Sequence, residues 1–325
     1  MDVIALDDPT DARIRQWHGV VVAVHDADPG EDPAPDLEQT TARLLSVEQG
    51  SRQRLWAAVE DDAMLAVATL RLPGEPGADR PAEIDIQVHP HHRRRGLGTR
   101  LLAVAADGLR ADGRSSVIAQ VSAGTPAVPF VESHGFELVL TLRGLLLRLD
   151  DVPPERVAEL LAAGPPGYRL VRWRGVVPDD LADALAHAKH AMADLAEYEG
   201  LPWDAARVRE MAEMVAKRGD RLYTVAAVQG AVVAGFTEVV VPAEDPERAS
   251  QYDTAVVPEH RGRRLGIWVK AAMLEWLREE RPEVREIETD NAGDNSHMLA
   301  VNAELGFRWQ RESREYLAEV AHLPS

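Results

Sequence analysis

The sequence predicts an α/β fold built from two tandem domains, each with a mixed central β-sheet flanked by helices. Its length of 325 residues is enough for two domains that bury separate cores. Several motifs occur twice at a constant spacing, which indicates a duplicated domain. Within each copy, alternating segments typical of strands are interspersed with segments of helical periodicity.

The repeat has a spacing of 168 residues, as from Gly98 to Gly266. The Gly-Phe pairs near the end of each copy begin at Gly135 and Gly306, so the second copy is slightly longer. This spacing indicates two whole domains, because solenoid repeats are only about 20–50 residues long. The matching segments are Leu65–Thr69 with Val233–Thr237, Asp85–Pro90 with Asp253–Pro258, and His92–Gly98 with His260–Gly266.

Two Pro- and Gly-rich clusters, at 150–154 and 164–167, bracket a short helical stretch between the copies. We therefore expect an N-terminal domain at 1–148, a linker at 149–167 and a C-terminal domain at 168–325.

Both halves show the same order of elements, which is clearest in the second half. Alternation predicts the strands, Pro178-Asp179-Asp180 is a typical helix start, and Gln229-Gly230 is a typical hairpin turn. The predicted elements are, in order, a strand (168–174), two helices (178–197, 204–218), three strands (222–228, 231–241, 252–257), a helix (267–280), a strand (286–289), a helix (296–305) and a closing strand (307–319).

The composition excludes several classes of protein. A net charge of −18 disfavours nonspecific binding to nucleic acid or to an anionic membrane. The chain has no cysteine, which excludes a disulfide scaffold and a Cys nucleophile. The acidic segment Met1–Asp8 is not typical of a signal peptide. We expect a cytoplasmic protein with no nucleic-acid and no membrane partner.

The loop Arg93-x-x-Gly96-x-Gly98 follows a predicted strand and opens a predicted helix at 99–110, and its counterpart at 261–266 does the same. The first turn of a helix has backbone N–H groups without an internal partner, and its dipole favours anions. Glycines allow close approach of the backbone, and arginines supply positive charge. The duplicated loop therefore predicts a pyrophosphate site.

This pattern, with Val-x-Pro before the loop and Leu-Gly-Phe near the end of the second copy, resembles the GNAT superfamily of acyl-CoA-dependent N-acetyltransferases. The resemblance covers roughly 55–136 and 168–320. It implies acetyl-CoA as co-substrate and no metal, with the pyrophosphate on the loop and the pantetheine arm between two splayed strands. By motif position, the residues implied in cofactor binding are Val88, Arg93, Arg95, Gly96, Gly98 and Thr99 in the first half, and Val256, Val257, Arg261, Gly262, Arg263, Arg264, Leu265, Gly266, Ile267 and Asn295 in the second.

The two halves depart from the family pattern in different ways. Arg264 stands where the first half has Gly96, which puts close approach of the backbone in doubt. Asn302 falls where many family members carry a Tyr general acid, and the first half has the apolar Val131 there. We therefore expect a catalytic second half that includes Asn302, and a degenerate or regulatory first half.

Acetyl transfer to an amine requires removal of a proton from an ammonium group, whose pKa is near 10.4 in model compounds. Alternation places Gln251, Asp253 and Ala255 on one strand face. Glu238 lies on the preceding strand, so Glu238 and Asp253 are candidate bases beside the substrate. The alternative is that Asp253 caps a turn or pairs with an arginine. A strand-edge N–H, of Val256 or Val257, is expected to stabilise the oxyanion.

The resemblance places the acceptor pocket at the junction of the first two helices of the second half, where Tyr198, Glu199 and Trp203 are candidate substrate-binding residues. Packing of a hinge is the alternative for these side chains. His297, at a predicted helix start, is either an acid–base group near the acyl end or a helix-start residue. His89, His91 and His92 are expected to face solvent or phosphate and not a metal ion.

The sequence thus predicts an N-acetyltransferase that acetylates the amine of a small, cationic metabolite or antibiotic. Direct attack in a ternary complex is expected, since the chain has no cysteine for a covalent intermediate. Two alternatives are a non-catalytic acyl-CoA sensor or scaffold and a protein lysine or N-terminal acetyltransferase.

Overall fold

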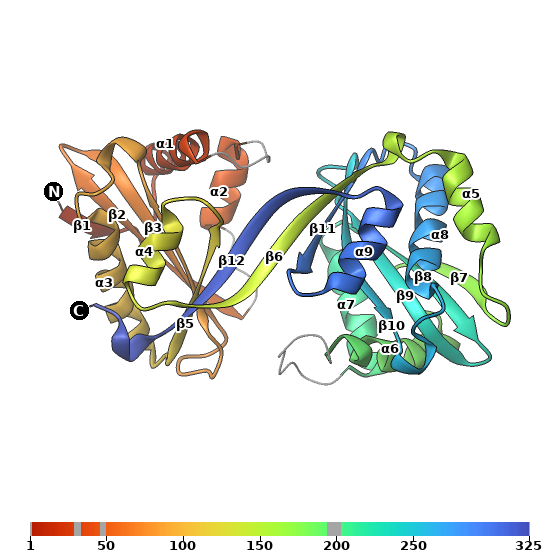
Figure 1. Ribbon diagram of the computed structural model, residues 1–325. Coiled ribbons are helices and arrows are strands. Elements are labelled where there is room, and N and C mark those ends of the chain that lie inside the picture. The colour runs from red at the N-terminus through yellow and green to blue at the C-terminus, as the bar shows by residue number, and fades with distance from the viewer. Residues whose placement is uncertain (1, 29–33, 46–49, 194–202, 325) are drawn as a thin grey trace. The chain divides into compact units, whose positions relative to one another are not determined.

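The computed structural model describes residues 2–28, 34–45, 50–193 and 203–324. The chain forms two compact units (Figure 1). Unit 1 consists of Met1–Leu142 and Arg311–Ser325, and unit 2 consists of Arg143–Gln310. Each is a mixed β-sheet with helices on both faces, as the sequence predicts.

Unit 1 has a sheet of order β1-β2-β3-β4-β5-β12, in which only β4 and β5 form a parallel pair among the pairings described. Helix α3 packs on one face through Leu101 and Leu109, and helices α1 and α2 pack on the other through Trp17 and Leu44. The elements are β1 (Asp2–Ala5), α1 (Asp11–Ala27), α2 (Leu37–Leu45), β2 (Ser51–Glu60), β3 (Ala63–Pro73), β4 (Ala82–Val88), α3 (Leu97–Asp112), β5 (Ser116–Ser122), α4 (Ala127–Ser133) and β12 (Arg308–Glu319). Strand β6 (Glu137–Arg148) follows α4 in the sequence and belongs to the sheet of unit 2.

Unit 2 repeats this arrangement with the order β6-β11-β10-β9-β8-β7, and β10 and β11 are parallel. The predicted helices and strands of the second half are confirmed within a few residues, except that β10 and β11 are longer than expected. Residues 194–202, at the end of the first predicted helix, lie outside the described part of the chain. The elements are α5 (Pro154–Ala162), β7 (Arg169–Arg174), α6 (Ala182–Ala193), α7 (Ala205–Lys217), β8 (Arg221–Gln229), β9 (Val232–Val241), β10 (Arg248–Val256), α8 (Leu265–Glu280), β11 (Glu286–Ala292) and α9 (Ser296–Leu305).

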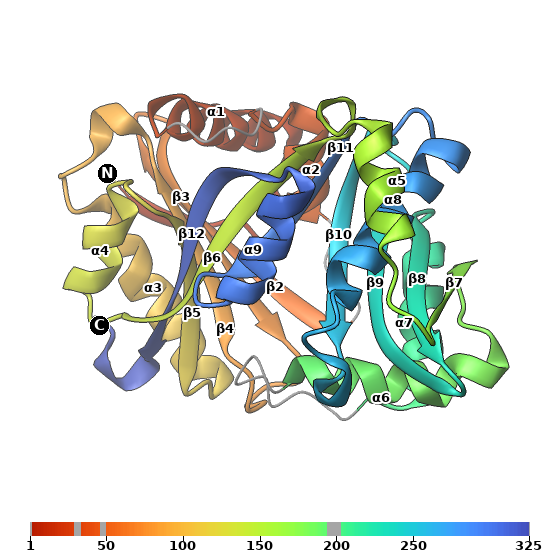
Figure 2. The ribbon, with the colours of Figure 1, turned by 45° about the vertical axis from the view of Figure 1, so that its right-hand side comes forward.

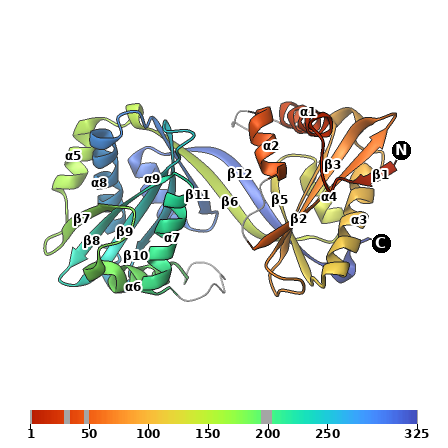
Figure 3. The same cartoon turned by 180° about the vertical axis from the view of Figure 1, so that it is seen from behind.

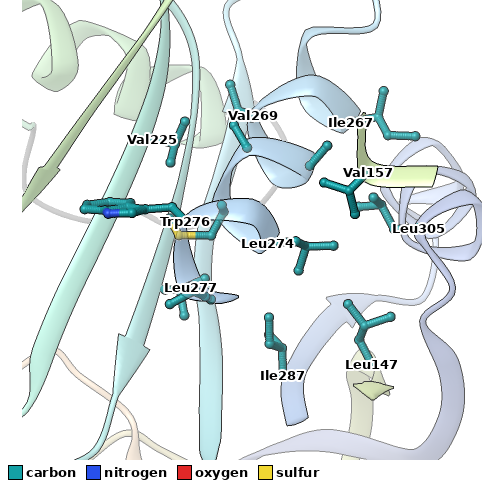
Figure 4. Packing of buried hydrophobic residues seen from close by; sticks show 14 of the residues in the cluster. Leu147, Val157, Val225, Ile267, Val269, Leu274, Trp276, Leu277, Ile287 and Leu305 are labelled. Carbon is teal, nitrogen blue, oxygen red and sulfur yellow. The ribbon is translucent and has the colours of Figure 1, made fainter. Parts of the chain in front are cut away.

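The two faces of the sheet in unit 2 have different helices (Figures 2 and 3). Helices α5 and α8 cover one face, where Trp276, Leu277 and Ile287 belong to the largest described core (Figure 4). Helix α6 covers the other face through Leu185, which packs in a cluster with Phe236. Side chains on β9 and β10 therefore point either toward α8 or toward α6.

The closing strands are exchanged between the two halves of the sequence. Strand β12, from the end of the chain, pairs with β5 and buries Tyr316 and Ala318 in the core of unit 1. Strand β6, from the first half, lies beside β11 and buries Leu145 and Leu147 in the core of unit 2. The compact units therefore differ from the expected domain boundaries, and helix α5 of the expected linker packs in unit 2.

The strand before the loop is straight in unit 1 and bulged in unit 2. The register of β3 and β4 is continuous from Ala66 opposite Val88 to Arg71 opposite Glu83. In unit 2 the register of β9 and β10 shifts between Gln251 and Thr254, so that β10 contains one extra residue. A β-bulge of this kind bends the strand and redirects side chains.

Candidate functional site

The Arg/Gly loop of unit 2 runs from the end of β10 to the start of α8, as the sequence predicts. A short 3-10 turn (Pro258–His260) precedes Arg261, and α8 begins at Leu265 with Arg264 as its N-cap. The backbone at this helix start faces the space that follows β10, so its unpaired N–H groups can bind an anion.

Arg264 adopts the left-handed conformation that Gly96 has in unit 1, with φ of 61° for Arg264 and 79° for Gly96. Two residues earlier in each loop there is a second left-handed position, and there the residue types are reversed. Unit 1 has Arg94 and unit 2 has Gly262, both with positive φ. The course of the loop is thus preserved in both copies. Each copy has one arginine in a conformation that costs about 1–2 kcal/mol for a residue with a Cβ atom.

A cavity of about 400 Å³ lies beside the loop of unit 2. This volume is within the range of small-molecule pockets, about 300–1,000 Å³. Most of the cofactor-binding residues predicted for the second half line it, whereas Val257 and Arg263 are not among the lining residues. The lining residues are Thr254, Ala255, Val256, Arg261, Gly262, Arg264, Leu265, Gly266, Ile267, Asn295, His297, Met298, Ala300, Val301 and Glu304.

The splay expected on the family pattern is present beside this cavity. Strands β10 and β11 pair only from Arg248 to Ser250, although both continue beyond that point. Asn295 caps helix α9 at the cavity wall by accepting a hydrogen bond from the N–H of Met298 at 3.1 Å. Of the two expected oxyanion donors, Val257 already donates its N–H to the carbonyl of Ala234 at 3.0 Å.

Glu238 and Asp253 lie together, and Lys189 of helix α6 lies between them. The Nζ atom of Lys189 is 2.6 Å from Oε2 of Glu238 and 2.5 Å from Oδ2 of Asp253. Lys189 and Glu238 are buried, whereas the Asp253 side chain keeps 29% of its surface exposed. Asp253 therefore pairs with a lysine and not with the arginine that the alternative reading expected.

The electrostatics of this cluster depend on burial and on its three charges. Burial disfavours the ammonium of Lys189, but the two carboxylates outweigh this effect and raise its pKa above the ordinary value. Burial, together with the neighbouring carboxylate of Asp253, raises the pKa of Glu238 more than the ammonium of Lys189 lowers it. Lys189 therefore stays protonated at neutral pH, and Asp253 is the member of the cluster most open to solvent.

The bulge corrects the expectation that Gln251, Asp253 and Ala255 share one face. Gln251 points toward α8, where its Oε1 accepts a hydrogen bond from Lys270 at 3.1 Å. Asp253 and Ala255 point toward α6. Alternation fails here because the extra residue in β10 changes the parity of the strand.

Asn302, the residue expected to be catalytic at the family's Tyr position, is fully buried. Its Oδ1 accepts a hydrogen bond from Nζ of Lys270 at 2.9 Å, and its Nδ2 donates to Asn291 at 3.2 Å. Burial lowers the pKa of Lys270 from 10.5 to about 7. The side-chain amides of Asn302 and Asn291 and the amine of Lys270 thus form a buried polar cluster behind the cavity.

Among the expected acceptor-binding residues, Trp203 is half-buried at the start of α7, and its ring centroid is 4.7 Å from Nζ of Lys189. The guanidinium of Arg207 lies 4.6 Å from the same ring. Tyr198 and Glu199 lie outside the described residues. Trp203 therefore joins the cluster of Lys189, Glu238 and Asp253.

In unit 1 the matching loop is engaged by other side chains. Arg93 forms hydrogen bonds with Asp28 and with the carbonyl of Val88, and Arg95 lies 3.4 Å from Glu60. The ring of Phe130 packs over Gly98, where an added Cβ atom would lie 3.0 Å from the ring. Thr99 is hydrogen-bonded to His134 at 3.1 Å. By sequence spacing, Phe130 corresponds to Val301, which lines the cavity in unit 2.

Sequence reasoning missed Lys189 and Lys270. The chain contains three lysines against a large majority of arginines, and two of these three are buried in unit 2. Both follow small or apolar residues on predicted helices, in Leu185–Lys189 and Ile267–Lys270. A rare lysine within an apolar helix face was therefore the available signal.

Within the described part of the chain, no group of three or more His, Cys, Asp or Glu side chains is arranged to hold a metal ion. In the same part, the helices are too short or too polar to cross a membrane.

The repeated sheet, with its splayed parallel pair and a loop at the start of the next helix, is the architecture that the resemblance to acyl-CoA-dependent acetyltransferases implies. The sequence model of the Acetyltransferase (GNAT) family matches residues 18–136 and 189–307. The chain therefore belongs to the GNAT family and is a tandem N-acetyltransferase of that family.

Relatives and solved structures agree with this assignment. A mycothiol acetyltransferase of Sanguibacter keddieii is 29% identical over 287 residues, which cover 84% of each chain. One of Rhodococcus erythropolis is 28% identical over 258 residues, which cover 78% of this chain and 81% of the relative. A tandem GNAT protein from the clavulanic acid biosynthesis pathway is 28% identical, with a TM-score of 0.72 over 98% of both chains. A GCN5-related N-acetyltransferase from Sphaerobacter thermophilus, 19% identical with a TM-score of 0.72 over 98% of this chain and 96% of that chain, has the same fold.

Proposed function

We propose that unit 2 transfers an acetyl group from acetyl-CoA to the amine of a small, cationic molecule, and that unit 1 is a degenerate copy without this activity. The observation that carries the proposal is the cavity of about 400 Å³ at the loop of unit 2, beside the bulged strand. GNAT acetyltransferases use acetyl-CoA, and the residues of this cavity fit its diphosphate.

The fit rests on the local backbone of the loop. Gly262 has open space where a Cβ atom would lie, and a Cβ atom at Gly266 would contact only Val256, at 3.8 Å. A diphosphate can therefore approach the N–H groups at the start of α8. Arg261 lines the same cavity and supplies a positive charge. Acetyl-CoA, when bound, supplies the activated acetyl thioester.

We assign to Asp253 the role of accepting the proton of the amine. Its carboxylate is the accessible one of the pair, and Lys189 fixes its orientation. As the amine nitrogen bonds to the acetyl carbon, the carbon–sulfur bond breaks and its electron pair remains on sulfur. Asp253 accepts the proton lost by the nitrogen, directly or through a water molecule. The N–H of Val256 is the proposed donor to the oxyanion.

The acceptor site offers one accessible carboxylate to an amine. Asp253 is partly exposed, whereas the ring of Trp203 is already contacted by the cations of Lys189 and Arg207. The proposed preference for a cationic amine therefore rests on Asp253. The names of the relatives, mycothiol acetyltransferases, and the clavulanic acid pathway of the structural relative support a small-molecule acceptor.

The experiment is a panel of primary amines, aminoglycosides and a lysine-containing peptide, assayed for release of CoA thiol with a thiol reagent. Because the protein has no cysteine, the signal comes from CoA alone. We expect turnover with small amines. Turnover of the peptide alone would favour a protein acetyltransferase. Binding of acetyl-CoA with no turnover of any amine would favour a sensor.

Calorimetric titration with acetyl-CoA identifies the unit that binds the cofactor. Arg261→Ala is expected to weaken binding about tenfold, in line with loss of one charged hydrogen-bonding group. Arg93→Ala, the matching change in unit 1, is the control and is expected to leave the Kd unchanged. Weakened binding in the control alone would place the cofactor in unit 1.

A further inference from the structure

Lys270 lies inside the largest apolar core and bonds only to neutral groups among the contacts described. It is 2% exposed, and its Nζ atom donates to Asn302 Oδ1 at 2.9 Å and to Gln251 Oε1 at 3.1 Å. The ring of Phe307 is 5.3 Å away. Burying an amine costs free energy that a hydrocarbon side chain of the same size would not cost. The lysine therefore needs a reason other than packing.

Gln251 connects this amine to the bulge of β10. Its Nε2 donates to the carbonyl of Glu238 and to Oγ1 of Thr237, both at 2.8 Å. Thr237 is hydrogen-bonded across the strands to Thr254 at 2.8 Å. The two threonines and Gln251 thus span the positions between which the register shifts, where the ladder between β9 and β10 is interrupted. Lys270 therefore binds the side-chain oxygen of Gln251, and the side-chain nitrogen of Gln251 forms hydrogen bonds where the ladder is interrupted.

Unit 1 shows what the same fold does without these groups. At the matching positions it has Leu102 for Lys270, Val131 for Asn302 and Ile86 for Thr254. Ile84, which precedes Ile86 on the face toward α3 as Gln251 precedes Thr254 on the face toward α8, is buried in the apolar core. The strand is straight there. The polar cluster and the bulge therefore occur together in one copy and are both missing from the described part of the other.

The bulge in turn contains one of the reacting groups. Tyr252 and Asp253 lie between the two register positions, opposite the single residue Glu238. In this place Asp253 reaches Lys189 on the α6 side. Thr254, Ala255 and Val256 line the cavity directly after the bulge.

We propose that Lys270 is a positioning residue for acetyl transfer: it orients Gln251, which holds the bulge that places Asp253 at the acceptor site. The inference rests on the proposed function of unit 2. Lys270 itself does not touch the cavity. Its unprotonated form has two N–H donors for its two amide partners, in agreement with a pKa of about 7 in this core.

The test is Lys270→Met, which keeps the length of the side chain and removes its N–H donors. We expect kcat to fall about 10- to 100-fold, because small misplacements of reacting groups have effects of this size. The Kd for acetyl-CoA, measured by calorimetry, is expected to stay within about twofold, since the loop is not altered. Lys217→Met removes an exposed lysine of α7 and is the control that should match the wild type.

Gln251→Met provides the second arm. If Lys270 acts through Gln251, both single variants lower kcat and the double variant is no slower than the slower single one. Additive losses, or a Lys270→Met enzyme as fast as the wild type, would overturn the proposal. If Lys270→Met does not fold, Gln251→Met alone must lower kcat without weakening acetyl-CoA binding for the proposal to stand.

Amide hydrogen exchange separates this inference from the proposed function. Lys270→Met is expected to speed exchange at 251–254, and the matching segment 83–86 of unit 1 should not change. If exchange at 251–254 is faster in Lys270→Met but the wild type acetylates no amine, the proposed function is refuted. The link between Lys270 and the bulge would still stand. Unchanged exchange would refute the link itself.

Discussion

Unit 1 and unit 2 share a sheet order and a loop, but they differ in the few residues around the splayed strands. Unit 2 has a bulged strand, a buried lysine on each face of the sheet and a cavity beside its loop. Unit 1 has a straight strand, and Phe130 packs over its loop. The comparison teaches that the fold alone does not make the site. In the proposed site of unit 2, the additional polar groups and the cavity supply what the shared fold does not.

The largest expected difference between the units concerns the base. Asp253→Asn removes the proposed proton acceptor, and kcat is expected to fall about 100-fold or more. The Kd for acetyl-CoA should hardly change, because the carboxylate does not line the cavity at the loop. Steady-state kinetics and calorimetry measure the two quantities. Asp85→Asn in unit 1 is the matched control; an equal loss of kcat there, or equal losses of kcat and affinity in Asp253→Asn, would contradict the assignment.

Next in size is the effect of pH on stability through Lys270. Its pKa is about 7 in the folded protein and near 10.5 when unfolded, so the unfolded state binds more protons between these values. The free energy of unfolding therefore gains about 2 kcal/mol from this group between pH 7 and pH 9. Urea denaturation at both pH values should show this gain in the wild type and in Lys217→Met but not in Lys270→Met. Equal pH dependence in all three would show that the amine is not buried as described.

A smaller difference concerns the glycines of the two loops. Gly98→Ala is expected to destabilise the protein by about 1 kcal/mol, because the new Cβ atom would lie 3.0 Å from Phe130. Gly266→Ala should leave stability unchanged or slightly raised, since its Cβ atom has room and alanine favours helices. The same change should weaken acetyl-CoA binding by crowding the diphosphate. Thermal denaturation and calorimetry check both; loss of acetyl-CoA binding in Gly98→Ala alone would reverse the roles of the units.

The smallest effect is expected at the left-handed arginines. Arg264→Gly should stabilise the protein by about 0.5–1 kcal/mol, because glycine adopts this conformation without strain. The ion pair of Arg264 with Glu304 is exposed and contributes little. Arg94→Gly in unit 1, at the other left-handed position, should give a similar gain in urea denaturation. A loss of stability in both variants would mean that the side chains matter more than the backbone strain.

Much of the fold follows from the sequence because the repeat and the periodicity are strong. The exchange of closing strands does not follow, since β6 and β12 stand at equivalent positions in the two copies and the sequence does not indicate which sheet each one joins. The pair of Glu238 and Asp253 was predicted from strand neighbours. Lys189 was not, because its helix lies far from both in sequence. The bulge was missed because one extra residue leaves no signal in alternation until the partner strand is known.

The exchanged closing strands have a consequence for the order of assembly. The sheet of unit 1 is completed by residues 313–319, which lie almost two hundred positions after their partners at 116–122. During synthesis on the ribosome, the first half must therefore wait with an open sheet edge until nearly the whole polypeptide has emerged. Pairings between such distant segments slow folding and leave edges available for wrong partners. Cutting the gene between the copies would leave each product with the strand that belongs to its neighbour.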